Sequence, residues 1–110
     1  MGTISTNSGV FTLINVFTVE PEHQEKLRDI LVEATEEVVK HFPGYISANI
    51  HLSLDGTSVI NYAQWRSEAD FRTMHADPKA REHFAACREI SKPNPVFCTV
   101  SYVDEARTTA

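Results

Sequence analysis

Two segments of alternating side chains flank Asp55-Gly56, and this hairpin signal is the strongest constraint on the fold. Residues 45–54 read as a half-polar strand, and residues 59–65 follow as Val-Ile-Asn-Tyr-Ala-Gln-Trp. Side chains at every second position of a strand share a face, so Asn61 points to the same side as Trp65, the only tryptophan. A buried amide must be hydrogen-bonded, so Asn61 is expected to bind either the protein or a ligand.

The remaining periodic segments complete a β, α, β, β, α, β order. The predicted elements are strands at 10–19 and 96–103, a long helix at 22–42, a short helix capped by Ser67, and a helix from Asp77-Pro78 to about residue 90. This order predicts an α+β, ferredoxin-like βαββαβ domain at 10–103, with a four-stranded antiparallel sheet and the helices on one face. The ends, 1–9 and 104–110, are expected to be flexible.

The strands are apolar on both faces, although helices can cover only one of them. Val10, Ile14, Val16, Ile60 and Tyr62 would form a large apolar patch on the uncovered face. Because monomers rarely expose such a patch, the sequence predicts a homodimer that packs sheet to sheet.

The composition excludes several classes of protein. The chain has 110 residues, suited to one domain, with 42% hydrophobic and 23% charged residues. A net charge of −5 with scattered basic residues argues against a nucleic-acid partner, and no apolar run approaches the ~20 residues of a membrane span. Cys87 and Cys98 lack metal-ligand spacing, so free thiols, no metal and a cytoplasmic location are expected.

Asn15 places a second amide within an apolar strand face, and further segments resemble a known family. These are Pro43-Gly44-Tyr45-Ile46-Ser47-Ala48, Asp55-Gly56-Thr57, Asn61-Tyr62-Ala63-Gln64-Trp65 and Ala76-Asp77-Pro78. Together, over 10–103, they resemble the antibiotic biosynthesis monooxygenase family, and most closely its cofactor-free, quinone-forming members. The resemblance implies a dimeric α+β barrel with one pocket per subunit between sheet and helices.

The resemblance also implies which residues form the site. Asn15, Asn61 and Trp65 match the catalytic positions of the family's oxygenases, and Phe71, His83 and Phe84 are expected to line the substrate pocket. The implied reaction uses no cofactor: a small aromatic phenol or anthrone loses a proton, reacts with O2 and yields a quinone. N–H donors stabilise the oxyanion and peroxide. Some members have a tyrosine where this chain has Phe71, and an arginine near Phe84.

Two other functions stay open. The aromatic replacements at Phe71 and Phe84 fit a non-catalytic, small-molecule-binding dimer. A haem-degrading monooxygenase ranks lower: Asn15 and His83 fit two of its roles, but Thr73 stands where a tryptophan is required. Singly, each amide, Trp65, His75 and His83 is more often structural; the site is inferred from two amides and the indole sharing one face.

Overall fold

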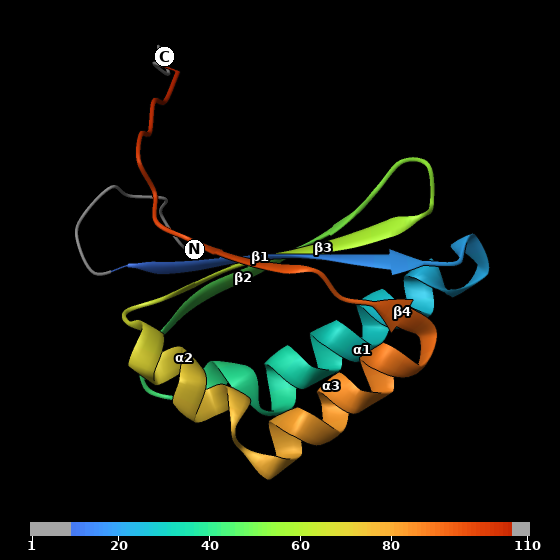
Figure 1. Cartoon of the computed structure of the whole chain (residues 1–110), viewed down its shortest axis with the longest axis horizontal. Helices are drawn as coiled ribbons and strands as arrows, with labels where there is room; N and C mark the ends of the chain where they lie inside the picture. Colours follow the sequence, from blue (N-terminus) through green and yellow to red (C-terminus); the bar gives the residue numbers. More distant parts are fainter. Residues whose placement is uncertain (1–9, 107–110) are drawn as a thin grey trace.

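The computed structural model describes residues 10–106, in which an antiparallel sheet is covered on one face by three α-helices (Figure 1). The strands are β1 (Phe11–Val19), β2 (Tyr45–Leu52), β3 (Ser58–Trp65), β4 (Ser91–Lys92) and β5 (Pro95–Cys98). The helices are α1 (Gln24–Glu37), α2 (Glu68–His75) and α3 (Pro78–Ile90), with 3₁₀ turns η1 (Pro21–His23) and η2 (Val39–His41). Strand order is β2-β3-β1-β4, with β5 also paired to β1. The predicted α+β class and ferredoxin-like order are confirmed, but two short strands, β4 and β5, stand beside β1 in place of the single fourth strand that was predicted.

The predicted hairpin is confirmed as the β2–β3 pair, although β2 ends two residues earlier than expected. The Asp55 carboxylate organises the turn by accepting hydrogen bonds from the Thr57 backbone N–H at 3.0 Å, the Thr57 hydroxyl at 2.8 Å and the Ser53 hydroxyl at 2.8 Å. Gly56 has a φ of 80°, in the left-handed region that glycine adopts without strain. Side-chain bonds and glycine thus close the turn.

The register of β1 and β3 determines what faces the helices. Antiparallel pairing sets Asn15 opposite Asn61, between the pairs Leu13–Ala63 and Phe17–Val59. Leu13, Phe17, Val59 and Ala63 belong to the buried core, so Asn15 and Asn61 lie on the same, helix-covered face. The sheet therefore holds two amides side by side.

The bounds predicted for the long helix, 22–42, are wrong at both ends. Residues 21–23 form η1, α1 ends at Glu37, and Val38 leaves helical geometry with φ −128° and ψ −63°. This break lets Val38 and Val39, adjacent in sequence, both reach the buried core. The two predicted caps are confirmed: Ser67 accepts from the backbone N–H of Asp70, and Asp77 caps α3.

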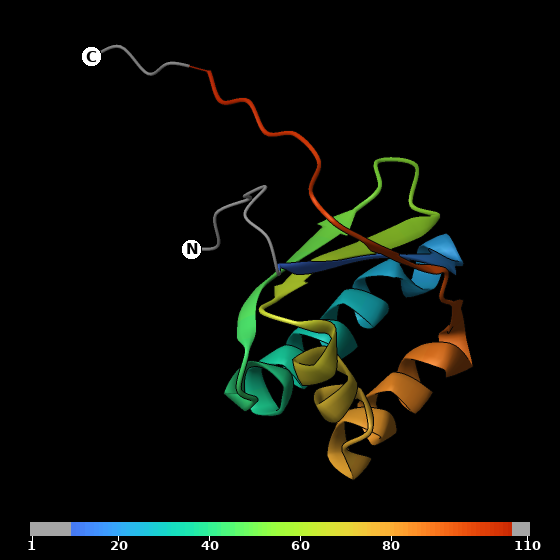
Figure 2. The same cartoon turned by 60° about the vertical axis from the view of Figure 1, so that its left-hand side comes forward.

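The strand predicted at 96–103 is also wrong in extent. Pairing ends at Cys98, which lies opposite Thr12, and β1 itself begins at Phe11, so β1 offers a partner for at most one more residue. Residues 99–106 have no helix or strand and leave the sheet on the side away from the helices (Figures 1 and 2). Of the predicted flexible ends, 1–9 and 107–110 lie outside the described residues.

The core divides into two clusters between the sheet and the helices. One contains Leu13, Trp65 and Phe71, and the other contains Phe17 and Leu27. Along β1 and β3 the amide pair lies between these clusters.

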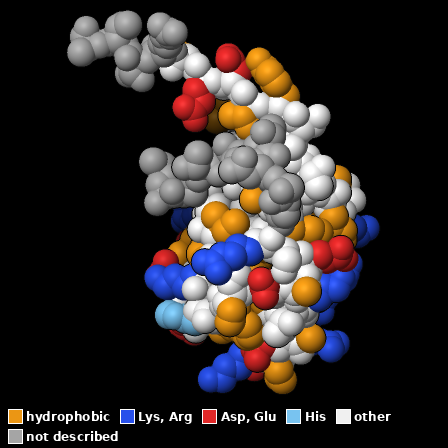
Figure 3. All heavy atoms as spheres, turned by 90° about the vertical axis from the view of Figure 1, so that its left-hand side faces the viewer, with side chains coloured by type: hydrophobic (Ala, Val, Ile, Leu, Met, Phe, Trp, Pro, Cys, Tyr) orange, Lys and Arg blue, Asp and Glu red, His pale blue; other side chains and the backbone are white. Residues whose placement is uncertain are grey.

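At the end of the molecule where α2 lies, charged side chains of both signs are spread among hydrophobic ones (Figure 3). Among the described residues, no helix is both long and apolar enough to cross a membrane.

Candidate active site

A cavity of about 190 Å³ lies between the sheet and the helices. Its wall is mainly apolar, and the few polar side chains come from separate elements, as is typical of ligand sites. The residues relevant to chemistry are Asn15, Tyr45, Asn61, Trp65, Phe71, His75 and Phe84. The structure therefore brings together five of the six site residues predicted from the sequence.

The two amides of the cavity differ in their bonding. The Asn15 side-chain oxygen accepts a hydrogen bond from the Asn94 backbone N–H at 3.1 Å, so Asn15 keeps its two N–H donors. The Asn61 side-chain oxygen is buried and has no hydrogen-bond partner. Leaving such an acceptor unpaired costs roughly 1–3 kcal/mol. The cavity thus holds an acceptor that a hydroxyl-bearing ligand can satisfy.

Aromatic rings form the wall beside the amides. Trp65 is 1% exposed and meets Tyr45 edge to face at 5.6 Å between ring centroids, and Phe71 at 6.2 Å. Phe11 and Phe97 lie 5.4 Å and 5.7 Å from Phe71. Such a wall offers flat apolar surfaces and ring edges, which suit a planar aromatic ligand.

His75 is a candidate proton acceptor that the sequence reasoning treated as structural. Its ring lies 5.6 Å from both Phe71 and Phe84, and it lines the cavity while staying exposed at the surface. Desolvation by its neighbours, followed by the positive charges of Arg81, Arg72 and Arg88, lowers the pKa of His75 below 6.5. Its imidazole is therefore neutral at neutral pH and can take a proton. The sequence feature that could have indicated this role is the position of His75 four residues after Phe71, on the same helix face.

Tyr45 supplies a hydroxyl to a cavity in which position 71 has none. Burial raises the pKa of Tyr45 above 10.0, so the phenol keeps its proton at neutral pH. Sequence analysis could not single out Tyr45 as a cavity residue, because a half-polar strand predicts no specific role for its side chains. The structure thus adds one protonated hydroxyl to the wall that contains Phe71.

The cysteines are both free thiols. Cys87 lines the cavity, and burial raises the pKa of its thiol to about 11. Only a minute fraction is thiolate at neutral pH, so Cys87 acts as a small apolar wall residue rather than a nucleophile.

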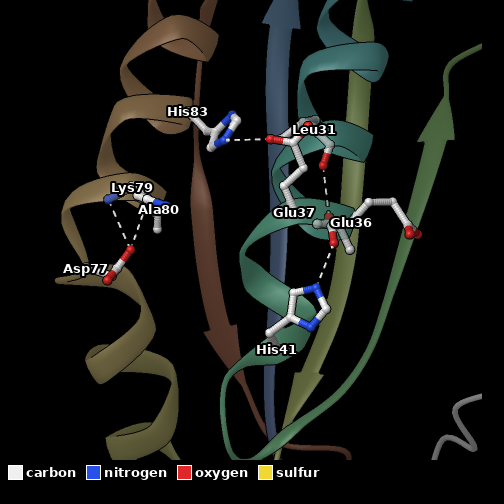
Figure 4. A network of polar contacts seen from close by, with 9 residues as sticks. Leu31, Glu36, Glu37, His41, Asp77, Lys79, Ala80 and His83 are labelled. Carbon is white, nitrogen blue, oxygen red and sulfur yellow. Dashed lines mark hydrogen bonds and ion pairs between the residues drawn. The ribbon is translucent and has the colours of Figure 1, made fainter.

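His83 is the predicted pocket residue that the structure places elsewhere. Its imidazole Nε2 lies 4.0 Å from a carboxylate oxygen of Glu37 on α1, and His83 is not part of the cavity wall (Figure 4). Glu33, Glu37 and His83 are close enough to hold a metal ion, but both carboxylates are exposed, as in ordinary surface ion pairs. The expectation that His83 lines the pocket is therefore wrong.

Comparison with known proteins identifies the family. The model of the antibiotic biosynthesis monooxygenase family matches residues 10–89. The chain belongs to this family. Tetracenomycin-F1 monooxygenase of Streptomyces glaucescens is 58% identical over 102 residues, which are 93% of this chain and 91% of that protein.

Two solved structures have a fold similar to that of this chain. The monooxygenase ActVA-Orf6 of Streptomyces coelicolor, in complex with nanaomycin D, is 34% identical with a TM-score of 0.80, covering 88% of this chain and 92% of that one. SnoaB of Streptomyces nogalater, a cofactor-independent oxygenase, has a TM-score of 0.77 at 22% identity, covering 87% and 97%. The predicted family and monooxygenase class are confirmed, whereas the roles of individual residues stay predictions.

Proposed function

We propose that this antibiotic biosynthesis monooxygenase oxidises a polyketide-type aromatic phenol or anthrone to a quinone with O2 and without a cofactor. The observation that carries the proposal is the unpartnered, buried oxygen of Asn61 in an aromatic-walled cavity, opposite Asn15. A phenolic O–H is the donor that this oxygen lacks. The 58% identity to a tetracenomycin-F1 monooxygenase supports the substrate class.

The proposed reaction begins with proton removal. The substrate O–H donates to the Asn61 oxygen while neutral His75 takes the acidic proton, which leaves an electron-rich enolate. The enolate carbon transfers its electron pair to O2 and forms a C–O bond, giving a peroxide anion. That anion recovers the proton from His75, and the hydroperoxide then loses water. One oxygen atom ends in the new carbonyl and the other in water, so the step is balanced.

The polar groups of the cavity act on the charge that develops. Asn15 retains two N–H donors because Asn94 holds its oxygen, and the Trp65 indole provides a third donor in the same wall. Such donors are strongest where water is excluded, and removing one typically costs on the order of 100-fold in rate. Asn15, Asn61 and Trp65 are therefore proposed as the catalytic residues beside the proton acceptor His75, with Phe71 and Phe84 as the walls that hold the ring.

Oxygen uptake tests this function directly. The purified protein is mixed with 1,8-dihydroxyanthrone in buffer without added cofactor, and protein-free oxidation is subtracted. Asn61→Ala and Trp65→Phe are expected to slow turnover on the order of 100-fold, whereas Asn49→Ala, which changes an exposed amide on β2, should match the parent. Equal rates for the parent and both cavity variants would refute the proposal.

A non-catalytic binder is the second candidate, because Phe71 is buried in the wall without a hydroxyl. It predicts that an aromatic ligand raises the melting temperature of the protein while oxygen uptake stays at the protein-free rate. The position of His83, paired with Glu37 and outside the cavity, removes the reason to favour haem degradation.

We also propose that the protein is a homodimer. Ile14, Val16, Ile60 and Tyr62 are only half-buried on the sheet face away from the helices, and Tyr102 in the unpaired segment is 79% exposed. A second copy would cover these apolar side chains.

Sedimentation velocity measures the oligomeric state. The parent is expected to sediment as a dimer at micromolar concentration, and Ile60→Glu should weaken the dimer because it places a charge within the apolar face. Val32→Glu adds the same charge at an exposed position of α1, on the other side of the sheet, and should leave the dimer intact. A monomeric parent would disprove the dimer.

The cytoplasm is the proposed compartment. Both cysteines are free, and Cys87 is buried among apolar side chains rather than paired. Free thiols are typical of proteins kept in a reducing compartment. Fractionation of the producing cells, with the protein followed by immunoblot, tests this location.

A further inference from the structure

A second hollow adjoins the cavity on the side of α2 and α3. It is lined by Arg72, His75, Ala76, Arg81, Phe84 and Arg88, and four of these, Arg72, His75, Phe84 and Arg88, also line the cavity. The two spaces therefore share a wall. A ligand bound against Trp65 and the amide pair has this hollow as its neighbour.

The hollow is basic although the chain is acidic. It contains three arginines and no carboxylate, in a protein with 15 acidic and 10 basic residues. Among residues 10–106, Arg81 and Arg88 take part in no ion pair, whereas Arg72 pairs with Glu68 at 2.8 Å. Desolvation by burial, followed by the same three positive charges, lowers the pKa of His75. Two guanidinium groups beside the cavity thus have their hydrogen-bonding capacity available for an anion.

The third arginine connects the hollow to the aromatic wall. The Arg72 guanidinium carbon lies 5.7 Å from the centre of the Phe97 ring, and Phe97 in turn lies 5.7 Å from Phe71. Arg72 also contacts Glu68 through an exposed ion pair on the same helix. Arg72 therefore lies between the hollow and the aromatic wall of the cavity.

We propose that Arg72, Arg81 and Arg88 form a carboxylate-binding subsite, and that the substrate is an aromatic phenol or anthrone bearing a carboxylate on its ring system. This inference rests on the proposed function for its substrate class. The planar guanidinium fork matches a planar carboxylate with two parallel hydrogen bonds, which is why arginine recognises this group. The arginines position the acidic end while the other end of the molecule reaches Asn61.

Binding of two quinones that differ in one substituent tests the subsite without turnover. Rhein and chrysophanol are both 1,8-dihydroxyanthraquinones, with a carboxylate in rhein where chrysophanol has a methyl group. Quenching of Trp65, the only tryptophan and a cavity residue, reports binding of either. The parent is expected to bind rhein at least about tenfold more tightly than chrysophanol, and the preference should weaken as salt screens the charges.

The arginines are tested by neutralising the two without an ion-pair partner. The double variant Arg81→Gln and Arg88→Gln is expected to lose most of the preference for rhein while binding chrysophanol as before. Arg66→Gln removes an exposed arginine directly after β3 that lines neither space, and should bind as the parent does. Thermal unfolding of each variant verifies that the fold is kept.

Three results would overturn the subsite: equal affinity of the parent for both quinones, a preference for rhein that survives in the double variant, or displacement of rhein by inorganic phosphate at lower concentration than by benzoate. The last would assign the arginines to a phosphate instead. Because binding is measured with product-like quinones, failure of oxygen uptake leaves this test unaffected, and failure of the subsite leaves oxygen uptake of 1,8-dihydroxyanthrone unaffected.

Discussion

Replacing Asn61 with leucine should make the protein more stable and less active at the same time. The Asn61 side-chain oxygen is buried without a partner, which costs roughly 1–3 kcal/mol of folding free energy. Leucine removes that polar atom, and the adjoining cavity of about 190 Å³ has room for the extra methyl groups. At about 4–8 °C per kcal/mol for a domain of this size, the melting temperature should rise by at least about 4 °C.

The same substitution removes the acceptor proposed for the substrate hydroxyl. Oxygen uptake with 1,8-dihydroxyanthrone should fall on the order of 100-fold. Differential scanning calorimetry and oxygen uptake on one preparation measure both effects. A variant that is less stable than the parent and equally active would refute the reasoning, because it would mean that the Asn61 oxygen is satisfied in the folded protein and idle in the reaction.

Asn15→Leu is the matched control for the sign of the stability change. The Asn15 oxygen accepts a hydrogen bond from the Asn94 backbone N–H, which also donates to the Val16 carbonyl, so loss of the Asn15 oxygen should destabilise the protein by about 0.5 kcal/mol. Activity should fall in this variant as well, because Asn15 supplies N–H donors to the same cavity. Two neighbouring Asn→Leu changes are thus expected to move stability in opposite directions and activity in the same one.

Two further predictions concern His75 of α2 and Gly44, a turn residue that packs against α2. If His75 takes the substrate proton, kcat/KM should be level above pH 6.5 and should fall as the pH drops through the lowered pKa of His75. His75→Gln should abolish this fall at acid pH. A fall that persists in the variant would assign the titration to another group. Gly44→Ala should cost about 1–3 kcal/mol, because Gly44 has a φ of 87° and an added Cβ would lie 2.2 Å from a carboxylate oxygen of Asp70. Urea unfolding measures this loss, and an unchanged midpoint would contradict it.

The local patterns in the sequence predicted the sheet and its inner face. The Asp55-Gly56 turn defined one hairpin, and alternation alone placed Asn61 and Trp65 on one side. The side that the helices cover, and the pairing of Asn15 with Asn61, depended on the order of elements, which the family resemblance supported. These predictions succeeded because strand alternation and a tight turn are encoded within a few residues.

The predictions that failed depended on partners far away in the chain. Residues 96–103 alternate like a strand, but the ladder stops at Cys98, opposite Thr12, because β1 begins only one residue earlier, at Phe11. His83 and His75 are both histidines on amphipathic helices, and periodicity could not say which of them faces the cavity. The packing of α2 and α3 decided it: His75 turns toward Phe84, and His83 turns toward Glu37 on α1.

The sheet forms one side of the cavity and helices α2 and α3 form the other. The residues proposed for oxyanion stabilisation lie on the sheet, and those proposed for substrate choice lie on the helices. The amide pair is fixed by the β1–β3 ladder, in which a register shift by one residue would turn the amide of the shifted strand to the other face. His75 and the three arginines come from α2 and α3 instead, and all four are exposed. Changes to the arginines should therefore alter which ring substituent is bound, with the enolate and peroxide steps intact, whereas changes to the amide pair should slow every substrate alike.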